Sequence, residues 1–352
     1  MQTGYLRARS SDRGADIRLH AHNGEETLSM SRSKDPRHHL VYSDRYETDL
    51  SVLGTPVDFA PSRGRQVLAR LRAEFGEQIV ARRARQLTFK QIAQTHDHKY
   101  LQDLKDAATW SQIFGVPRVL PHSRETARIL ARLFYDYRLK SGGTFEAAKL
   151  ALKYGLAANL GGGYHHAHRD RGDGFCLIND IAMTTNLVIS QGLCKKVMVV
   201  DLDFHQGNGT ASILYGRDDV FILDVFAREG WPYRKEPVDL AVPLSTRDSH
   251  LYLDKLKAAL TQALGRFAPD LVLFVQGADA FEYGLHNRGD NFALTLDQMK
   301  ERNELVIDTM VERGIPLAMV FAGGYGPRAW EAHYQGVRHL LIRSEVLRSD
   351  LP

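Results

Sequence analysis

The sequence predicts an α/β protein: a single large domain with a central parallel sheet flanked by helices. Short runs of continuous apolar character, typical of strands buried on both faces, alternate with segments of helical periodicity, and this alternation indicates parallel βαβ units. The chain has 352 residues, 43% of them hydrophobic and 25% charged, as in ordinary globular proteins. A chain of this length has room for one large α/β domain.

The beginning of the chain differs from the rest. Residues 1–38 mix Arg, Ser, Asp, Gly and His with almost no apolar periodicity, a composition that cannot offset the entropy of ordering. We therefore predict a disordered polar tail over residues 1–38 and a catalytic domain over residues 39–352. The first part of this domain, Ser62–Tyr154, is predicted to be mostly helical, with a capping-type start at Ser123.

Four buried strands are expected in the second part of the chain, with helices around them. The predicted strands are Lys196–Asp203, Val220–Val225, Asp270–Gln276 and Pro316–Phe321. The predicted helices are Ile178–Gly192, His250–Phe267, Thr295–Gly314 and Pro327–Arg343. Ligands of open α/β sheets bind beyond the carboxyl ends of the strands, so the polar residues that follow these strands are the first candidates for a site.

The composition also excludes several classes of protein. No apolar run approaches the roughly 18 residues of a membrane-spanning helix, and Met1–Ser10 lacks the apolar core of a secretory signal. Only two cysteines occur, Cys176 and Cys194, which is too few for a disulfide framework and fits a reducing compartment. We therefore predict a cytoplasmic protein.

A basic segment raises the question of nucleic-acid binding. The segment Ser62–Lys90 holds eight basic residues: Arg63, Arg65, Arg70, Arg72, Arg82, Arg83, Arg85 and Lys90. The whole chain is nearly balanced, however, with 46 basic and 42 acidic side chains. We interpret the segment as a solvated helix face and expect no nucleic-acid partner, with a nucleic-acid-associated protein as the weaker alternative.

Two carboxylates and a histidine form a candidate metal site. Asp203 and His205 lie two positions apart at the end of an extended segment, so both side chains point to one face. Asp279 follows a neighbouring strand end, and the three side chains together would form a catalytic zinc site with an open position for water. An isolated Asp-x-His string more often forms hydrogen bonds with loop backbone than binds a metal. Here the string follows an apolar strand, where an unpaired charge is costly, and this favours a metal site. Asp201, one step further back, would orient an imidazole or hold a structural cation.

A histidine pair follows the three glycines Gly161–Gly163. Extended neighbours such as His165 and His166 point to opposite sides, but a glycine-rich turn lets both side chains reach one cavity. A histidine pair is more often structural or at the surface. Its place after a glycine turn favours a functional role here.

These strings resemble the histone deacetylase superfamily, which has the arginase/deacetylase α/β fold. Five motifs occur in the family's order: Asn159–Ala167, Asp173–Ala182, Val199–Thr210, Gln276–Ala280 and Phe321–Gly326. The chain is most similar to class IV members, judged by residues 96–101, 205–209 and 223–225. The resemblance implies one zinc ion per chain, bound by Asp203, His205 and Asp279, and an acid/base pair, His165 and His166.

The resemblance also assigns residues around this centre. Tyr325 would donate a hydrogen bond to the developing oxyanion, although apart from the metal motifs it would be an ordinary turn tyrosine. The implied substrate-binding residues are Gly174, Phe175, Gly324 and, as the opposite aromatic wall, Trp231 or Tyr233. A potassium ion is implied at Asp201 and Asp224 with the backbone of Asp203 and His205. Asn208 replaces a carboxylate found in some members, so His166 should be less basic.

The predicted function is that of a zinc-dependent deacetylase or deacylase. It would remove an acetyl or longer fatty-acyl group from acylated lysine in proteins or from a related small acylated amine. The alternatives are an acylpolyamine amidohydrolase and a non-catalytic acyl-lysine-binding protein. A two-metal ureohydrolase is disfavoured, because Ala280 and Phe281 follow Asp279 and provide no second carboxylate.

Overall fold

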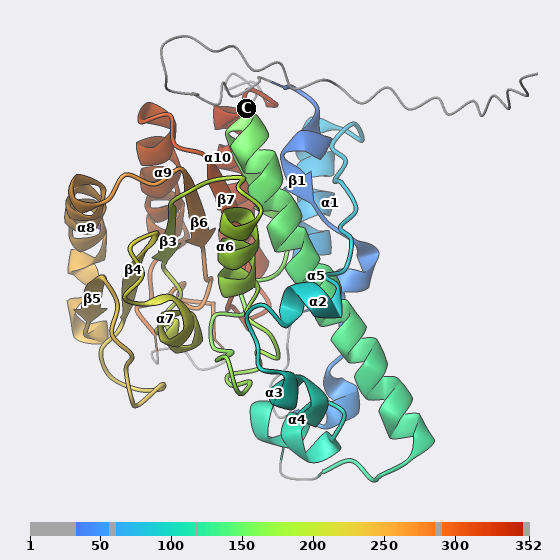
Figure 1. Ribbon diagram of the computed structural model, residues 1–352. Coiled ribbons are helices and arrows are strands. Elements are labelled where there is room, and N and C mark those ends of the chain that lie inside the picture. The colour runs from blue at the N-terminus through green and yellow to red at the C-terminus, as the bar shows by residue number, and fades with distance from the viewer. Residues whose placement is uncertain (1–32, 56–60, 117–118, 286–290, 348–352) are drawn as a thin grey trace, which may run out of the picture.

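Seven parallel strands form one sheet at the centre of the protein (Figure 1). The computed structural model describes residues 33–55, 61–116, 119–285 and 291–347. The strand order is β1-β2-β7-β6-β3-β4-β5. The strands are β1 (Leu40–Val41), β2 (Leu156–Asn159), β3 (Val197–Asp201), β4 (Val220–Ala227), β5 (Leu240–Leu244), β6 (Leu271–Val275) and β7 (Leu317–Val320). The predicted α/β class with a parallel sheet is confirmed.

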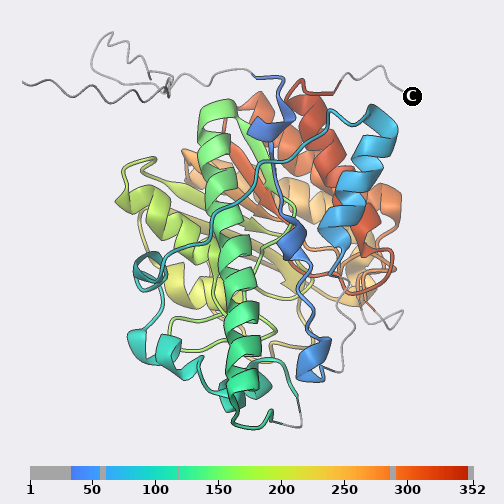
Figure 2. The same ribbon diagram turned by 90° about the vertical axis from the view of Figure 1, so that its right-hand side faces the viewer.

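Helices pack on both faces of this sheet (Figures 1 and 2). They are α1 (Arg63–Phe75), α2 (Phe89–Ile92), α3 (His98–Asp103), α4 (Ala107–Ile113), α5 (Arg124–Tyr154), α6 (Asp180–Ser190), α7 (Asn208–Leu214), α8 (Tyr252–Arg266), α9 (Leu296–Glu312) and α10 (Ala329–Arg343). Short 3-10 turns are Pro36–His38, Asp44–Tyr46, Ser51–Leu53 and Thr246–Leu251. Every helix in the described ranges is too short or too polar to span a lipid bilayer.

The two faces of the sheet have separate cores, because successive strand residues point to opposite sides. In β3, Met198 and Val200 belong to the core shared with α1, α8, α9 and α10. Val197 and Val199 belong to the core shared with α5 and α6. All four side chains are fully buried, which explains the continuous apolar run in the sequence.

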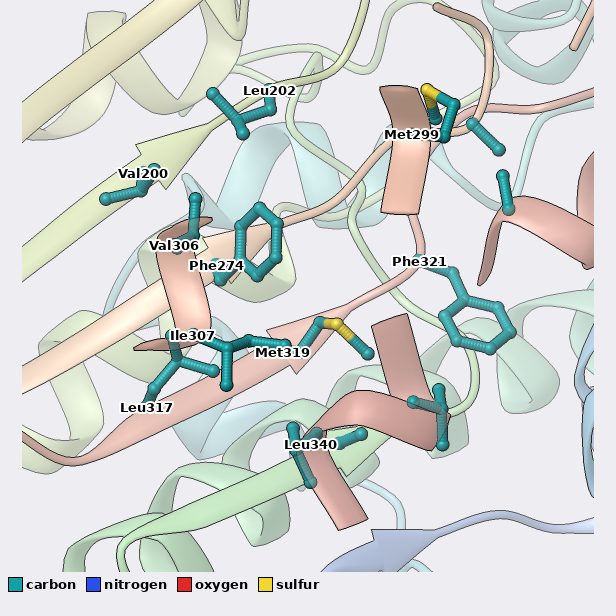
Figure 3. Close-up of a cluster of buried hydrophobic side chains, with 14 of the residues drawn as sticks. Val200, Leu202, Phe274, Met299, Val306, Ile307, Leu317, Met319, Phe321 and Leu340 are labelled. Carbon is teal, nitrogen blue, oxygen red and sulfur yellow. The ribbon is translucent and has the colours of Figure 1, made fainter. Parts of the chain in front are cut away.

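Figure 3 shows part of the first core. Val200, Phe274 and Met319 of three neighbouring strands lie beside Val306 of α9 and Leu340 of α10. This packing fixes the strands next to one another. It thereby places the loops that follow them at one edge of the sheet.

Three strands were not predicted from the sequence. β5 has the sequence Leu-Ala-Val-Pro-Leu, and only its last residue, Leu244, is buried. It also contains Pro243, which cannot donate a hydrogen bond and is unusual inside a sheet. It lies at one edge of the sheet, and the two-residue β1 lies at the other. β2 is buried throughout, but its four residues merge with the glycine turn that follows.

The end of the predicted tail is packed in the structure. Pro36–His38 forms a 3-10 turn, and the His38 ring stacks on Tyr154 of α5 at 4.2 Å between centroids. Residues 1–32 of the predicted tail, which include the segment Met1–Ser10, lie outside the described residues.

Candidate active site

The predicted metal ligands meet at the carboxyl edge of the sheet. Asp203 and His205 follow β3 and Asp279 follows β6, and these strands are neighbours. One possible ligand atom from each residue lies within 4.8 Å of the others. His205 Nδ1 is 3.3 Å from Asp203 Oδ1 and 3.1 Å from Asp279 Oδ2. Both carboxylates are fully buried.

The charge state of this cluster fits a bound cation. Burial and the neighbouring Asp203 raise the pKa of Asp279 to about 6. Asp279 Oδ1 is buried and has no hydrogen-bond partner among the described residues. Burial opposes a charge on His205, but its hydrogen bonds to the two carboxylates raise its pKa to about 9. Burial opposes a charge on Asp203, but the neighbouring His165 and His205 hold its pKa well below its usual range, so this carboxylate stays ionised. Two carboxylates and an imidazole are the donor set of a catalytic zinc site.

Gly323, in the loop after β7, lies directly against both carboxylates. Its N–H donates a hydrogen bond of 2.8 Å to Asp203 Oδ2. A Cβ at this position would clash with both carboxylate oxygens of Asp279. Only glycine allows the loop to approach the cluster so closely.

Arg302 of α9 holds the two ligand-bearing loops together. Its guanidinium is fully buried and donates to Leu202 O at 3.0 Å and to Gly277 O at 2.8 Å. This residue was not predicted from the sequence. A signal was present, since Arg302 occupies an apolar-face position of its helix between Met299 and Val306.

The histidine pair reaches the site through the predicted glycine turn. Gly162 and Gly163 have φ of +73° and +87°, which favour glycine. Asp180, at the start of α6, accepts hydrogen bonds from the N–H groups of Gly163 at 2.9 Å and Tyr164 at 2.6 Å. This carboxylate fixes the turn just before His165.

His165 and His166 have different partners and different charge. Their ring centroids are 3.9 Å apart, and both side chains are buried. Burial lowers the pKa of His165, but Asp201, with its Oδ2 2.8 Å from His165 Nδ1, and Asp203 outweigh burial and raise it to about 10. Burial and the neighbouring His165 hold the pKa of His166 well below its usual range. His165 is therefore an imidazolium and His166 a neutral imidazole at pH 7.

Asn208 is the partner of His166, as expected. Its Oδ1 lies 2.8 Å from His166 Nδ1, and its Nδ2 lies 3.3 Å from His168 Nε2. His168 Nδ1 is 2.7 Å from Ser212 Oγ, which itself donates to Gly209 O. This network orients the amide so that Oδ1 accepts from His166 Nδ1–H, which leaves His166 Nε2 unprotonated. Neither His168 nor Ser212 was predicted from the sequence.

Phe175 is held by backbone contacts beside the site. It has a left-handed φ of +66°, a rare conformation for a bulky residue. Its N–H donates to Ile113 O at 3.2 Å, and its carbonyl accepts from the Tyr137 hydroxyl at 2.8 Å. Its ring lies 6.0 Å from the ring of Tyr325.

Trp231 is the second aromatic side chain at the site. Its ring lies 4.4 Å from the ring of His166 and 5.6 Å from that of His205. A side chain at Gly174 would clash with Trp231 and His166. The assignment of Tyr233 to this wall is wrong, because its side chain is 88% exposed.

Tyr325 follows the glycines of the β7 loop. Its N–H donates to Gly284 O at 2.7 Å. Burial and the carboxylate of Asp279 raise the pKa of Tyr325 well above its usual range, so the hydroxyl keeps its proton and is a hydrogen-bond donor. Gly324, expected to bind substrate, borders the same pocket as Tyr325 and has a φ of +121°.

A pocket extends from the histidines into the protein. It is lined by 23 residues, including His165, His166, Phe175, Tyr325, Tyr46, Thr48, Arg63 and Lys140. The prediction that Arg63 lies on a solvated helix face is wrong. Its Nη1 donates to Ala322 O at 3.0 Å and to Gly323 O at 2.9 Å. Its neighbours Arg65 and Arg70 are exposed, as expected.

Asp201 and Asp224 provide a second candidate cation site. They are paired in register on β3 and β4. Asp224 Oδ2 accepts from Gly207 N–H at 3.0 Å, whereas its Oδ1 is buried without a partner among the described residues. Burial and the neighbouring Asp201 raise the pKa of Asp224 well above its usual range. These oxygens fit the implied potassium ion.

A parallel sheet with an Asp-His-Asp cluster and paired histidines at its carboxyl edge is typical of a metal-dependent hydrolase built on an α/β fold. The family model described as Histone deacetylase domain matches residues 57–341. The chain therefore belongs to the histone deacetylase family.

Individual relatives agree with this assignment. Histone deacetylase 2 of Arabidopsis thaliana is 36% identical over 239 residues, which cover 65% of this chain and 59% of the relative. Acetylpolyamine amidohydrolase of Mycoplana ramosa is 30% identical over 181 residues, covering 46% of this chain and 49% of the relative. The chain thus matches less than two thirds of their lengths.

A solved structure shows the same fold. The acetylpolyamine aminohydrolase from Burkholderia pseudomallei superposes with a TM-score of 0.65 at 20% identity, covering 86% of this chain and 98% of that chain.

Proposed function

We propose that this protein is a zinc-dependent deacylase that hydrolyses the amide bond of acylated lysine or of a related acylated amine. One observation carries the proposal: the Asp203, His205 and Asp279 cluster lies beside two histidines, of which one is paired with a carboxylate and the other with an amide. Membership of the histone deacetylase family supports hydrolysis of an acyl amide. The donor set supports one zinc ion per chain.

The chain's own residues have distinct roles in this reaction. Zinc, when bound by the Asp-His-Asp cluster, would polarise the amide carbonyl and acidify a water molecule. His166, neutral and open at Nε2, accepts a proton from the attacking water, and the His165 imidazolium provides a proton for the leaving amine. Tyr325 donates a hydrogen bond to the oxyanion that develops on the carbonyl oxygen.

The aromatic side chains define where the amine part of the substrate lies. Phe175 is close to Tyr325, and Trp231 is close to His166. The aliphatic stem of a lysine or a polyamine fits between such rings, because methylene groups gain from burial against aromatic faces. We assign Phe175 and Trp231 to this role.

Two alternatives have different support. An acylpolyamine substrate is favoured by the similarity to the amidohydrolase of Mycoplana ramosa. A non-catalytic binder is disfavoured, since binding needs no neutral base such as His166 beside the cluster.

A second catalytic metal at Asp279 is disfavoured because Ala280 and Phe281 are fully buried apolar neighbours. We also propose that the protein is cytoplasmic, because its low cysteine content fits a reducing compartment.

The test is hydrolysis of one lysine peptide that carries acetyl, octanoyl or myristoyl, with metal content measured on the same sample and a chelator control. Acyl release that rises with zinc content and stops with chelator supports the proposal. The rates along the series show which acyl-chain length the protein prefers. A protein that binds about one zinc but releases nothing from these peptides or from acylpolyamines would be a binder.

A further inference from the structure

Two cationic side chains line the pocket beside the histidines. Lys140 comes from α5 and Arg63 from the first turn of α1, and both border the same space as His165, His166 and Tyr325. Neither takes part in the chemistry proposed above. The pocket has a volume of about 100 Å³, which suits a short acyl group.

Lys140 has a hydroxyl partner but no carboxylate partner. Its Nζ donates to Thr48 Oγ1 at 2.8 Å, and Thr48 is only 3% exposed. Asp136, one turn earlier on α5, is paired with Arg45 at 3.1 Å. Among the described residues, no carboxylate lies within ion-pair distance of Lys140.

Arg63 is in the same situation. Its Nη1 is used by the carbonyls of Ala322 and Gly323 and by His333. Its Nε and Nη2 have no hydrogen-bond acceptor in the described parts of the chain, and no carboxylate pairs with it there. One pocket therefore contains two basic side chains that form no ion pair with a carboxylate of the described residues.

An unbalanced cation is costly in so enclosed a place. Burial lowers the pKa of Lys140 to about 7, in spite of Asp136. An anion in the pocket would restore the full charge of the ammonium group, and the Thr48 hydroxyl, whose oxygen accepts from Lys140, still has a proton to donate. Two cations and a hydroxyl are a suitable donor set for a carboxylate.

We infer that this pocket receives an acyl group that ends in a carboxylate, a short dicarboxylic acyl such as succinyl or glutaryl. The inference rests on the proposed function, since the amide carbon must lie at His166 and Tyr325 while the far carboxylate pairs with Lys140 and Arg63. Hydrolysis breaks the amide C–N bond and forms a C–O bond. Water supplies hydroxyl to the acyl carbon and a proton to the amine, so the products are a dicarboxylate and free lysine.

The test compares two lysine peptides that differ only at the acyl terminus. One carries succinyl, and the other carries its neutral isostere, succinamoyl, in which an amide replaces the carboxylate. With zinc-loaded protein, kcat/KM should favour the succinyl peptide by about tenfold or more, as expected for hydrogen bonds to a charged group. In Lys140→Met this ratio should fall towards one.

Lys149→Met is the matched control, because Lys149 lies on the same helix and pairs with Glu146. It should keep the ratio of the unsubstituted protein. Thermal melting of both variants checks that they fold. If Lys140→Met does not fold, Thr48→Val tests the same pocket through its hydroxyl and should also lower the ratio.

The outcomes separate this inference from the proposed function. Hydrolysis of acetyl-lysine without preference for succinyl overturns the inference alone. Free succinate that inhibits acetyl-peptide hydrolysis without such a preference identifies an anion site and also overturns it. If no peptide is hydrolysed, the proposed function fails, and calorimetric titration of the two peptides decides: tighter binding of the succinyl peptide supports the pocket, and equal affinity overturns it.

Discussion

Asn208 Oδ1 lies 2.8 Å from His166 Nδ1 and supplies a neutral hydrogen-bond acceptor to this histidine. The neighbouring His165 instead faces the carboxylate of Asp201 at the same distance. Two adjacent imidazoles thus differ in charge because one has an amide partner and the other an acid. The difference gives one histidine the properties of a base and the other those of an acid.

Asn208→Asp should move the acidic limb of the kcat/KM profile to higher pH. A carboxylate beside Nδ1 stabilises the imidazolium, so it raises the pKa of His166 above its present low value. His166 accepts a proton only when neutral, and activity should therefore fall more at pH 6 than at pH 8. An acidic limb at the same pH in the variant would exclude His166 as the base.

Tyr325→Phe should retain zinc and lose most turnover. The hydroxyl stays protonated in its buried position, and loss of one oxyanion donor typically lowers kcat by about 10²–10³-fold. Steady-state kinetics and metal analysis on the same preparation check both parts. Turnover like that of the unsubstituted protein would remove the assigned role.

Gly323→Ala should lower metal content while the fold is retained. The added methyl group would clash with the Asp279 carboxylate, which must then turn away from His205. Mass spectrometry after dialysis measures the bound zinc. Gly265→Ala on α8 is the control, because its added methyl group would meet no atom of the described residues within 4 Å, and it should keep zinc. Equal zinc content in both variants would contradict the close approach at Gly323.

Arg302→Met should destabilise the protein and loosen the metal site. The substitution leaves the buried carbonyls of Leu202 and Gly277 without donors, at a cost of about 1–3 kcal/mol each. Urea unfolding of the metal-free protein measures the free energy of unfolding. Arg313→Met, at the exposed end of the same helix, should change it little. A similar small effect of both substitutions would show that Arg302 is not a brace between the loops.

Chelation should lower the melting temperature of the protein, and zinc should restore it. The cluster holds two buried carboxylates, and a ligand that binds only the folded state stabilises it in proportion to the logarithm of its concentration. Asp279→Ala should melt at the same temperature with and without zinc. A zinc-dependent rise in that variant would place the metal elsewhere.

The local sequence was sufficient for four of the sheet's five interior strands, with β2 as the exception, and for the residues that meet at its carboxyl edge. A strand buried on both faces needs an unbroken apolar run, which is visible without knowing its neighbours. Because sites form where such strands end, the sequence also predicts that Asp203, His205 and Asp279 meet. The edge strand β5 is five residues long, contains Pro243 and buries only Leu244, so its local sequence does not mark it as a strand of the sheet.

Contacts across the fold decided the rest. Trp231 and Tyr233 are two residues apart and chemically alike, yet only the path of their loop places Trp231 against His166. Arg63 meets Gly323 across 260 residues of chain, and Lys140 meets Thr48 across 92. The sequence by itself determined which residues could do the chemistry, since periodicity and motif spacing are local. Only the tertiary structure decided the charge of each histidine and the lining of the pocket, because burial and partners depend on segments that meet when the chain folds.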